Sequence, residues 1–103
     1  MKISNLILRN DNGQLEIKLC SMPEWNDFDK IVSFLYNVYQ VKTIEKYDGP
    51  EGTRRWVFEC NEFQFELVYD DWFGNQLVSI TKDSQEFLCK VSDDLETYSL
   101  EKK

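Results

Sequence analysis

The chain has 103 residues, the size of a single domain, and carries a formal net charge of −7 with a sequence pI near 4.5. An acidic surface repels nucleic acid and anionic membranes, so we expect neither to bind directly. It favours a basic protein partner and speeds association with one; an acidic surface that serves only solubility is the alternative. Hydrophobic residues make up 42% of the chain, enough for a core without metal or disulfide bonds.

The cysteines and the N-terminal segment indicate a reducing, cytoplasmic location. Cys20, Cys60 and Cys89 are odd in number and widely spaced, which argues against a disulfide framework. No Cys-x-x-Cys pair and no histidine occur, so we expect no zinc site. The N-terminal apolar run is short and is interrupted by a charged turn, unlike a signal peptide, and no apolar stretch approaches the roughly 18 residues of a membrane-spanning helix.

A turn at Asn12-Gly13 predicts a first hairpin made of residues 2–9 and 14–20, because both turn residues tolerate a positive φ. The expected register places apolar side chains together and pairs opposite charges. It sets Leu8 opposite Ile17, Leu6 opposite Leu19 and Arg9 opposite Glu16.

The segment from Ser21 to Tyr39 predicts a helix that packs on a sheet. Ser21 is the expected N-cap, with Pro23 in the first turn and Glu24 completing a capping box. Apolar side chains recur at spacings of three and four and form one stripe. The stripe consists of Trp25, Phe28, Val32, Leu35 and Tyr39, widened by Ile31, Phe34 and Val38.

The central stretch from Arg54 to Thr81 predicts a hairpin followed by a further strand. A two-residue turn at Asn61-Glu62 places the apolar residues of both strands on one face of the hairpin, since side chains alternate along a strand. The apolar face receives Cys60 opposite Phe63, Phe58 opposite Phe65 and Trp56 opposite Leu67. The other face receives Glu59 with Gln64, Val57 with Glu66 and Arg55 with Val68.

The predicted fold class is α+β, a single mostly antiparallel sheet in the order ββ-α-ββββ-α with one long helix packed on one face. Residues 42–48 and 76–81 are expected strands, and residues 49–53 a loop. Residues 85–91 permit a strand, which would pair Ile80 with Phe87 and Val78 with Cys89, or a helix. The helix would have a stripe of Phe87, Leu88, Val91 and Leu95. We favour the strand, followed by a short helix near 93–100 that Ser92 caps.

Nothing in the sequence predicts an enzyme, a cofactor or a metal. The carboxylate pairs Glu62 with Glu66 and Asp70 with Asp71 have no spacing specific to acid–base catalysis. A serine or cysteine nucleophile would lack a histidine partner. The calcium-loop pattern and the glycine-rich phosphate loops are also absent from the sequence.

The predicted loop Asp70–Asn75 places two large aromatic side chains at the surface. Trp72 and Phe73 either fold back onto the sheet edge or form an aromatic anchor, ringed by carboxylates, for a pocket on a basic partner. Neighbouring residues extend this surface. The predicted partner-binding residues are Asp70, Asp71, Trp72, Phe73, Glu59, Glu66, Tyr47 and Glu51.

The run W-V-F-E, a turn, F-x-L-x-Y-D-D, then W-F-G-N and an aliphatic strand lies in residues 47–91. It resembles small acidic immunity proteins of bacterial polymorphic-toxin systems, including contact-dependent growth inhibition. The resemblance implies a cytoplasmic protein that binds a toxin domain, often a basic nuclease, and blocks its active site.

Three further classes of function remain open from the sequence. A small enzyme would have a deep pocket with carboxylates whose pKa values are shifted. A nucleic-acid mimic that inhibits a DNA-binding protein would use the same acidic electrostatics. An acidic secretion chaperone would be a stable homodimer with an apolar groove. We expect a monomer rather than a dimer, and a toxin gene beside this one would favour the immunity function.

Overall fold

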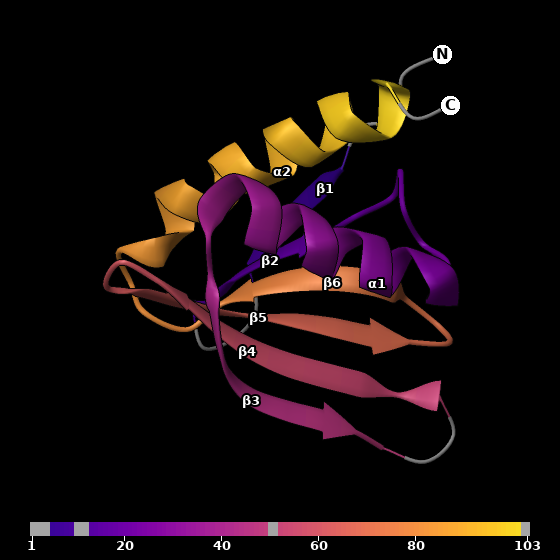
Figure 1. Ribbon diagram of the computed structural model, residues 1–103, viewed down its shortest axis with the longest axis horizontal. Coiled ribbons are helices and arrows are strands. Elements are labelled where there is room, and N and C mark those ends of the chain that lie inside the picture. Colours follow the sequence, from indigo (N-terminus) through magenta and orange to yellow (C-terminus); the bar gives the residue numbers. More distant parts are fainter. Residues whose placement is uncertain (1–4, 10–12, 50–51, 102–103) are drawn as a thin grey trace.

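The computed structural model describes residues 5–9, 13–49 and 52–101 and confirms the α+β class. Six antiparallel strands form one sheet, and both helices cover the same face of it (Figure 1). The strands are β1 (Leu6–Arg9), β2 (Leu15–Lys18), β3 (Lys42–Asp48), β4 (Arg54–Cys60), β5 (Phe63–Asp70) and β6 (Gly74–Ser79). The helices are α1 (Trp25–Phe34), continued by the π-helical turn η1 (Leu35–Tyr39), and α2 (Ser84–Glu101).

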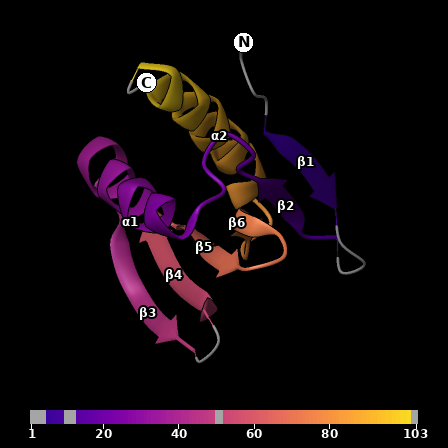
Figure 2. The ribbon, with the colours of Figure 1, turned by 90° about the vertical axis from the view of Figure 1, so that its right-hand side faces the viewer.

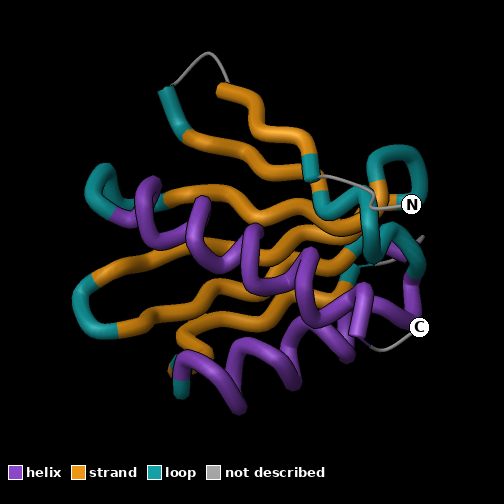
Figure 3. Tube along the Cα trace, turned by 90° about the horizontal axis from the view of Figure 1, so that it is seen from above, coloured by secondary structure: helices purple, strands orange, loops and turns teal. Residues whose placement is uncertain are grey.

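The order of strands across the sheet is β1-β2-β6-β5-β4-β3, which Figure 2 shows side by side. Helix α1 and η1 carry the chain over the sheet from β2 to the far edge, where β3 begins. Successive hairpins then return through β4 and β5, so that β6 pairs with β2. The connection from β2 to β3 therefore lies between the sheet and solvent, as Figure 3 shows for the helices above the strands.

The core lies between the sheet and the two helices. Alternate residues of the inner strands point into it, and the helices close it from above. The fully buried side chains include Phe28 and Ile31 from α1, Leu88, Val91 and Leu95 from α2, and Ile17, Phe58, Phe65, Leu67 and Leu77 from the strands. Each such side chain stabilises the fold by about 1.5–3 kcal/mol relative to an exposed one.

The register predicted for the central hairpin is confirmed at every pair. Cys60 lies opposite Phe63, Phe58 opposite Phe65 and Trp56 opposite Leu67. Asn61 adopts a φ of 58°, as the two-residue turn requires. The polar face is also as predicted: it pairs Glu59 with Gln64, Val57 with Glu66 and Arg55 with Val68.

The predicted register of the first hairpin is wrong by one residue. Ile7 lies opposite Ile17, whereas Leu6 and Leu8 lie opposite Lys18 and Glu16. The reason is the spacing of the strands: the last pair is Arg9 with Leu15, so five residues separate them, which does not fit the register of a two-residue turn. Asn12 and its neighbours at 10 and 11 lie outside the described residues. As a result, Leu6 and Leu8 share the helix-free face of the sheet.

The first helix begins later than predicted, and Ser21 is not its cap. Glu24 precedes the first helical residue, Trp25, and its N–H donates to Asp27 Oδ2 at 3.0 Å. The predicted stripe is buried between Phe28 and Leu35, but Trp25 and Val38 are 44% and 53% exposed. The exposure of Val38 follows from η1, because wider π-helical turns rotate the following side chains off the stripe.

The strand predicted for residues 85–91 is wrong, because this segment lies within α2. The position beside β6 is occupied by β2 on one side and β5 on the other, which leaves no place for a further strand. The helical alternative places Leu88, Val91 and Leu95 in the core, all fully buried. Ser92 is no cap: it is buried within α2, where its Oγ accepts a hydrogen bond from Asn5 Nδ2 (3.0 Å).

Candidate protein-binding site

The turn between β5 and β6 is fixed by one carboxylate. Asp70 Oδ1 accepts the N–H groups of Trp72 at 2.7 Å and Phe73 at 2.8 Å, and Asp70 pairs with Gly74 in the sheet. Gly74 has a φ of 71°, and a Cβ there would lie 2.8 Å from the carbonyl oxygen of Pro23. The strands therefore include Asp70, Gly74 and Asn75, and the loop is shorter than the predicted segment of residues 70–75.

The two aromatic side chains of this turn behave differently. Trp72 is 90% exposed, so it does not fold back onto the sheet. Phe73 is 57% exposed, and Lys18 Nζ lies 4.7 Å from the centroid of its ring, on the helix-free side of β2. Phe73 thus leans toward a sheet residue, whereas Trp72 stands out from a backbone that Asp70 holds.

Carboxylates from three elements gather at the same end of the molecule as this turn. We call this group the acidic end. It comprises Glu24, Asp27 and Asp29 at the start of α1, Asp48 at the end of β3, and Asp70 and Asp71 at the β5–β6 turn.

Contacts between these elements hold the acidic end together. Tyr69 packs edge-on against Trp25 with ring centroids 5.2 Å apart. Burial raises the pKa of the Tyr69 hydroxyl, and the carboxylates of Asp71, Glu24 and Asp70 raise it further. The β3–β4 loop also reaches the turn, because a Cβ at Gly52 would lie 3.2 Å from Asp71 Oδ1.

Arg54 is a largely buried cation within the acidic end, where Lys30 Nζ also lies 3.7 Å from Asp27 Oδ1. Its Nε lies 3.0 Å from Asp48 Oδ1 and its Nη1 3.3 Å from Asp29 Oδ1. Its guanidinium carbon lies 5.1, 4.1 and 5.0 Å from the ring centroids of Trp25, Phe28 and Trp56. The side chain is only 11% exposed, so Arg54 joins β3, β4 and α1 from within, and the sequence did not indicate this role.

Asp48 is the second residue that sequence reasoning missed. Its Oδ1 accepts hydrogen bonds from Trp56 Nε1 at 2.9 Å and Arg54 Nε at 3.0 Å. These bonds hold the pKa of the Asp48 carboxyl below its usual value. The available signal was weak, namely an aspartate that ends a strand just before a loop with strong breakers.

Glu66 and Glu59 do not join the acidic end. Glu66 is 14% exposed and its Oε2 lies 2.5 Å from Arg55 Nε, in the middle of the helix-free face. Glu59 lies at the far end of β4, where it accepts a hydrogen bond from Gln64 Nε2 at 3.3 Å. Tyr47 is 56% exposed beside the β3–β4 loop, and Glu51 lies outside the described residues. The predicted extension of the patch over Glu59 and Glu66 is therefore not a continuous acidic surface.

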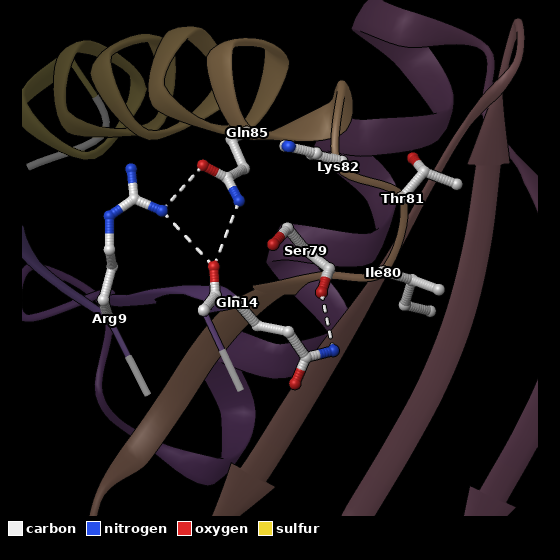
Figure 4. Close-up of a pocket in the computed structure, with 8 residues that line it drawn as sticks. Arg9, Gln14, Ser79, Ile80, Thr81, Lys82 and Gln85 are labelled. Atoms are coloured by element: carbon white, nitrogen blue, oxygen red, sulfur yellow. Dashed lines mark hydrogen bonds between the residues drawn. The ribbon is translucent and has the colours of Figure 1, made fainter. Parts of the chain in front are cut away.

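A polar pocket of about 570 Å³ lies at the opposite end of β6 (Figure 4). Its polar groups bind one another. Arg9 Nη1 donates to Gln85 Oε1 at 2.8 Å, Gln85 Nε2 donates to the Gly13 carbonyl at 3.2 Å, and Gln14 Nε2 donates to the Ser79 carbonyl at 3.0 Å. These bonds join β1, β6, α2 and the two residues before β2, and we assign the pocket a structural role.

Across the described ranges, no three side chains of the metal-binding types are arranged so that they could hold a metal ion, and no helix is long and apolar enough to cross a membrane. All three cysteines are free thiols. No protein-family model, no curated protein and no solved structure matches the chain. The case for a function therefore rests on the geometry of the acidic end.

Proposed function

We propose that this chain is a cytoplasmic immunity protein that binds and neutralises a cognate toxin domain, a basic nuclease, through the acidic end. The exposure of Trp72 in the turn that contains Asp70 and Asp71 carries the proposal. A side chain with 90% of its surface in water costs free energy in the free protein, and a partner's pocket recovers it. A rigid aromatic anchor within a charged rim is the arrangement typical of binding hot spots.

Preorganisation of the turn supports the same proposal. Asp70 already binds the N–H groups of Trp72 and Phe73, so little backbone entropy is lost when Trp72 docks. The carboxylates around it would steer a basic substrate-binding cleft toward the anchor and then lie against its cations. Occupation of that cleft would keep the nucleic-acid substrate out, which is how the chain would neutralise the toxin.

The experiment is binding of the protein encoded by the neighbouring gene, first by co-purification and then by kinetics at rising salt. Affinity is expected to fall with salt, mainly through slower association. Asp71→Lys should slow association, because Asp71 is exposed and the N–H groups of the turn bind Asp70. Glu62→Lys makes the same change of charge at the exposed β4–β5 turn, at the other end of the sheet, and should have a much smaller effect.

Trp72→Ala tests the anchor itself. We expect a loss of about 2 kcal/mol or more in binding free energy, chiefly through faster dissociation, with nearly unchanged thermal stability. Equal effects of Asp71→Lys and Glu62→Lys, or a Trp72→Ala variant that binds normally, would contradict the proposal. If the captured partner is a DNA-binding protein without toxic activity and duplex DNA competes for the same surface, the nucleic-acid mimic is the correct function instead.

A further inference from the structure

The two edges of the sheet differ in how they are protected. At the β3 edge, a β-bulge between Thr43 and Glu45 interrupts the strand, and most of its side chains are charged or polar. At the other edge, β1 reads Leu-Ile-Leu-Arg without a bulge, and Leu6, Ile7 and Leu8 are 49%, 51% and 41% exposed. A regular apolar edge of this kind is a template for another strand.

The alternation of hydrogen bonds in the sheet points the peptide groups of Ile7 outward. Leu19 N donates to the Asn75 carbonyl at 2.9 Å, so every second residue of β2 counted back from Leu19 faces β6. The intervening residues of β2 face β1 and bind Leu6 and Leu8, which lie opposite them. The N–H and C=O of Ile7 therefore point away from β2, where no other described strand lies.

We propose that β1 pairs antiparallel with β1 of a second copy, centred on Ile7, and so joins the two sheets into one. Leu-Ile-Leu reads the same in both directions, so Leu6 meets Leu8 of the second copy and Ile7 meets its own equivalent. Apolar side chains then meet apolar side chains on both faces. The outward N–H of Asn5 already donates to Glu96 Oε2 at 2.7 Å, so the pairing uses Ile7 and Arg9, and the symmetry of Leu-Ile-Leu sets its centre at Ile7.

The pairing is independent of the proposed function and leaves the acidic end free, because β1 lies at the edge remote from β3 and β4. It departs from the monomer expected from the sequence. Four residues span only about 14 Å, so the interface is smaller than the ~1,600 Å² of a standard complex. We expect a dissociation constant on the order of 10–100 μM.

Sedimentation equilibrium from about 1 μM to about 1 mM tests the association, since this range spans the expected constant. The natural chain should pass from monomer to dimer. Ile7→Pro should stay monomeric and folded, because proline removes an N–H that points away from β2 and suits an edge strand. Val38→Lys removes an equally exposed apolar side chain (53%) on η1 and should dimerise like the natural chain.

Cross-linking tests the register. Ile7→Cys should form an intermolecular disulfide on mild oxidation, because hydrogen-bonded antiparallel residues have Cα atoms about 5.5 Å apart, within disulfide range. Leu8→Cys, next in the chain, should not, because its own equivalent lies two residues along the pair, beyond about 7 Å. A monomer at about 1 mM, or equal cross-linking of both variants, overturns the proposal. The proposal is also overturned if the natural chain stays monomeric and the Ile7→Pro variant loses affinity for the toxin. The β1 edge would then bind the toxin and not a second copy.

Discussion

Arg54 has its guanidinium between three aromatic rings and two carboxylates, and this geometry uses its planar shape as much as its charge. We predict that Arg54→Lys lowers the free energy of unfolding by about 1–3 kcal/mol, since an ammonium group keeps the charge but loses the stacking and the forked hydrogen bonds. Arg55→Lys is the matched control on the next residue, where the side chain is 49% exposed. Its effect should stay below about 1 kcal/mol in urea unfolding. Equal effects would mean that the rings contribute nothing to holding Arg54.

Asp48 makes stability depend on pH at the residue scale. Its pKa is held below the ordinary value by hydrogen bonds from Trp56 and Arg54, so the ionised form favours the folded state. This stabilisation is complete above the unfolded pKa of about 3.9 and is lost as the pH falls through the lower folded pKa. Asp48→Asn keeps an acceptor oxygen but cannot ionise. The difference in melting temperature between the natural chain and this variant should therefore be constant above about pH 5 and shrink toward pH 2. A difference in melting temperature that grows toward low pH would mean that folding raises the pKa of Asp48 and does not lower it.

The central hairpin makes a prediction at the scale of elements. Phe58 and Phe65 face each other across β4 and β5 with ring centroids 5.7 Å apart, and both are fully buried. Phe58→Ala and Phe65→Ala should each lower the free energy of unfolding by about 3–5 kcal/mol, through lost burial and the cavity left behind. Phe73→Ala removes the same side chain where it is 57% exposed and should cost less than about 1 kcal/mol. Chemical denaturation of the three variants gives the comparison, and similar losses in all three would contradict the register.

The elements also show why some of the fold could be predicted from the sequence and some could not. In the central hairpin, polar and apolar residues alternate on both strands, so only one register keeps Phe58 and Phe65 inside. In β1 every residue from Leu6 to Leu8 is apolar, and a slip of one residue leaves the pattern unchanged. The pattern of apolar residues therefore does not decide the register, in which Arg9 pairs with Leu15.

The sequence pattern also leaves one helix and part of the site undetermined. The apolar residues of segment 85–91 fit both the spacing of a helix and the alternation of a strand. Only the occupied sheet positions beside β6 exclude the strand. The acidic end was partly predictable, because Trp72 and Asp71 stand next to each other in a turn. Asp29 and Asp48 belong to it through Arg54, a contact between segments distant in sequence that no local pattern encodes.

At the scale of the whole molecule, the acidic end and the β1 edge occupy different parts of the surface. The acidic end is built from loops and the start of α1, whereas β1 closes the sheet on the side away from β3. Two copies joined through β1 would therefore present two acidic ends. Avidity toward a surface-tethered partner would then rise with the concentration of the chain, whereas binding to a partner in solution would not.

The three cysteines report on the cooperativity of the whole fold. Cys60 is buried in the core beneath the helices, its Sγ donates to the Tyr39 carbonyl at 3.4 Å, and burial raises the pKa of its thiol. Cys20 and Cys89 are only partly buried. Because only the thiolate reacts and Cys60 is reached through wide opening of the core, its alkylation at pH 8 should be slower by a factor on the order of 100 or more. Mass spectrometry of the native chain over time gives the three rates, and the unfolded chain without reductant should take up three labels. Loss of two labels from the unfolded chain would indicate a disulfide, and rapid labelling of Cys60 would mean that the core opens without global unfolding.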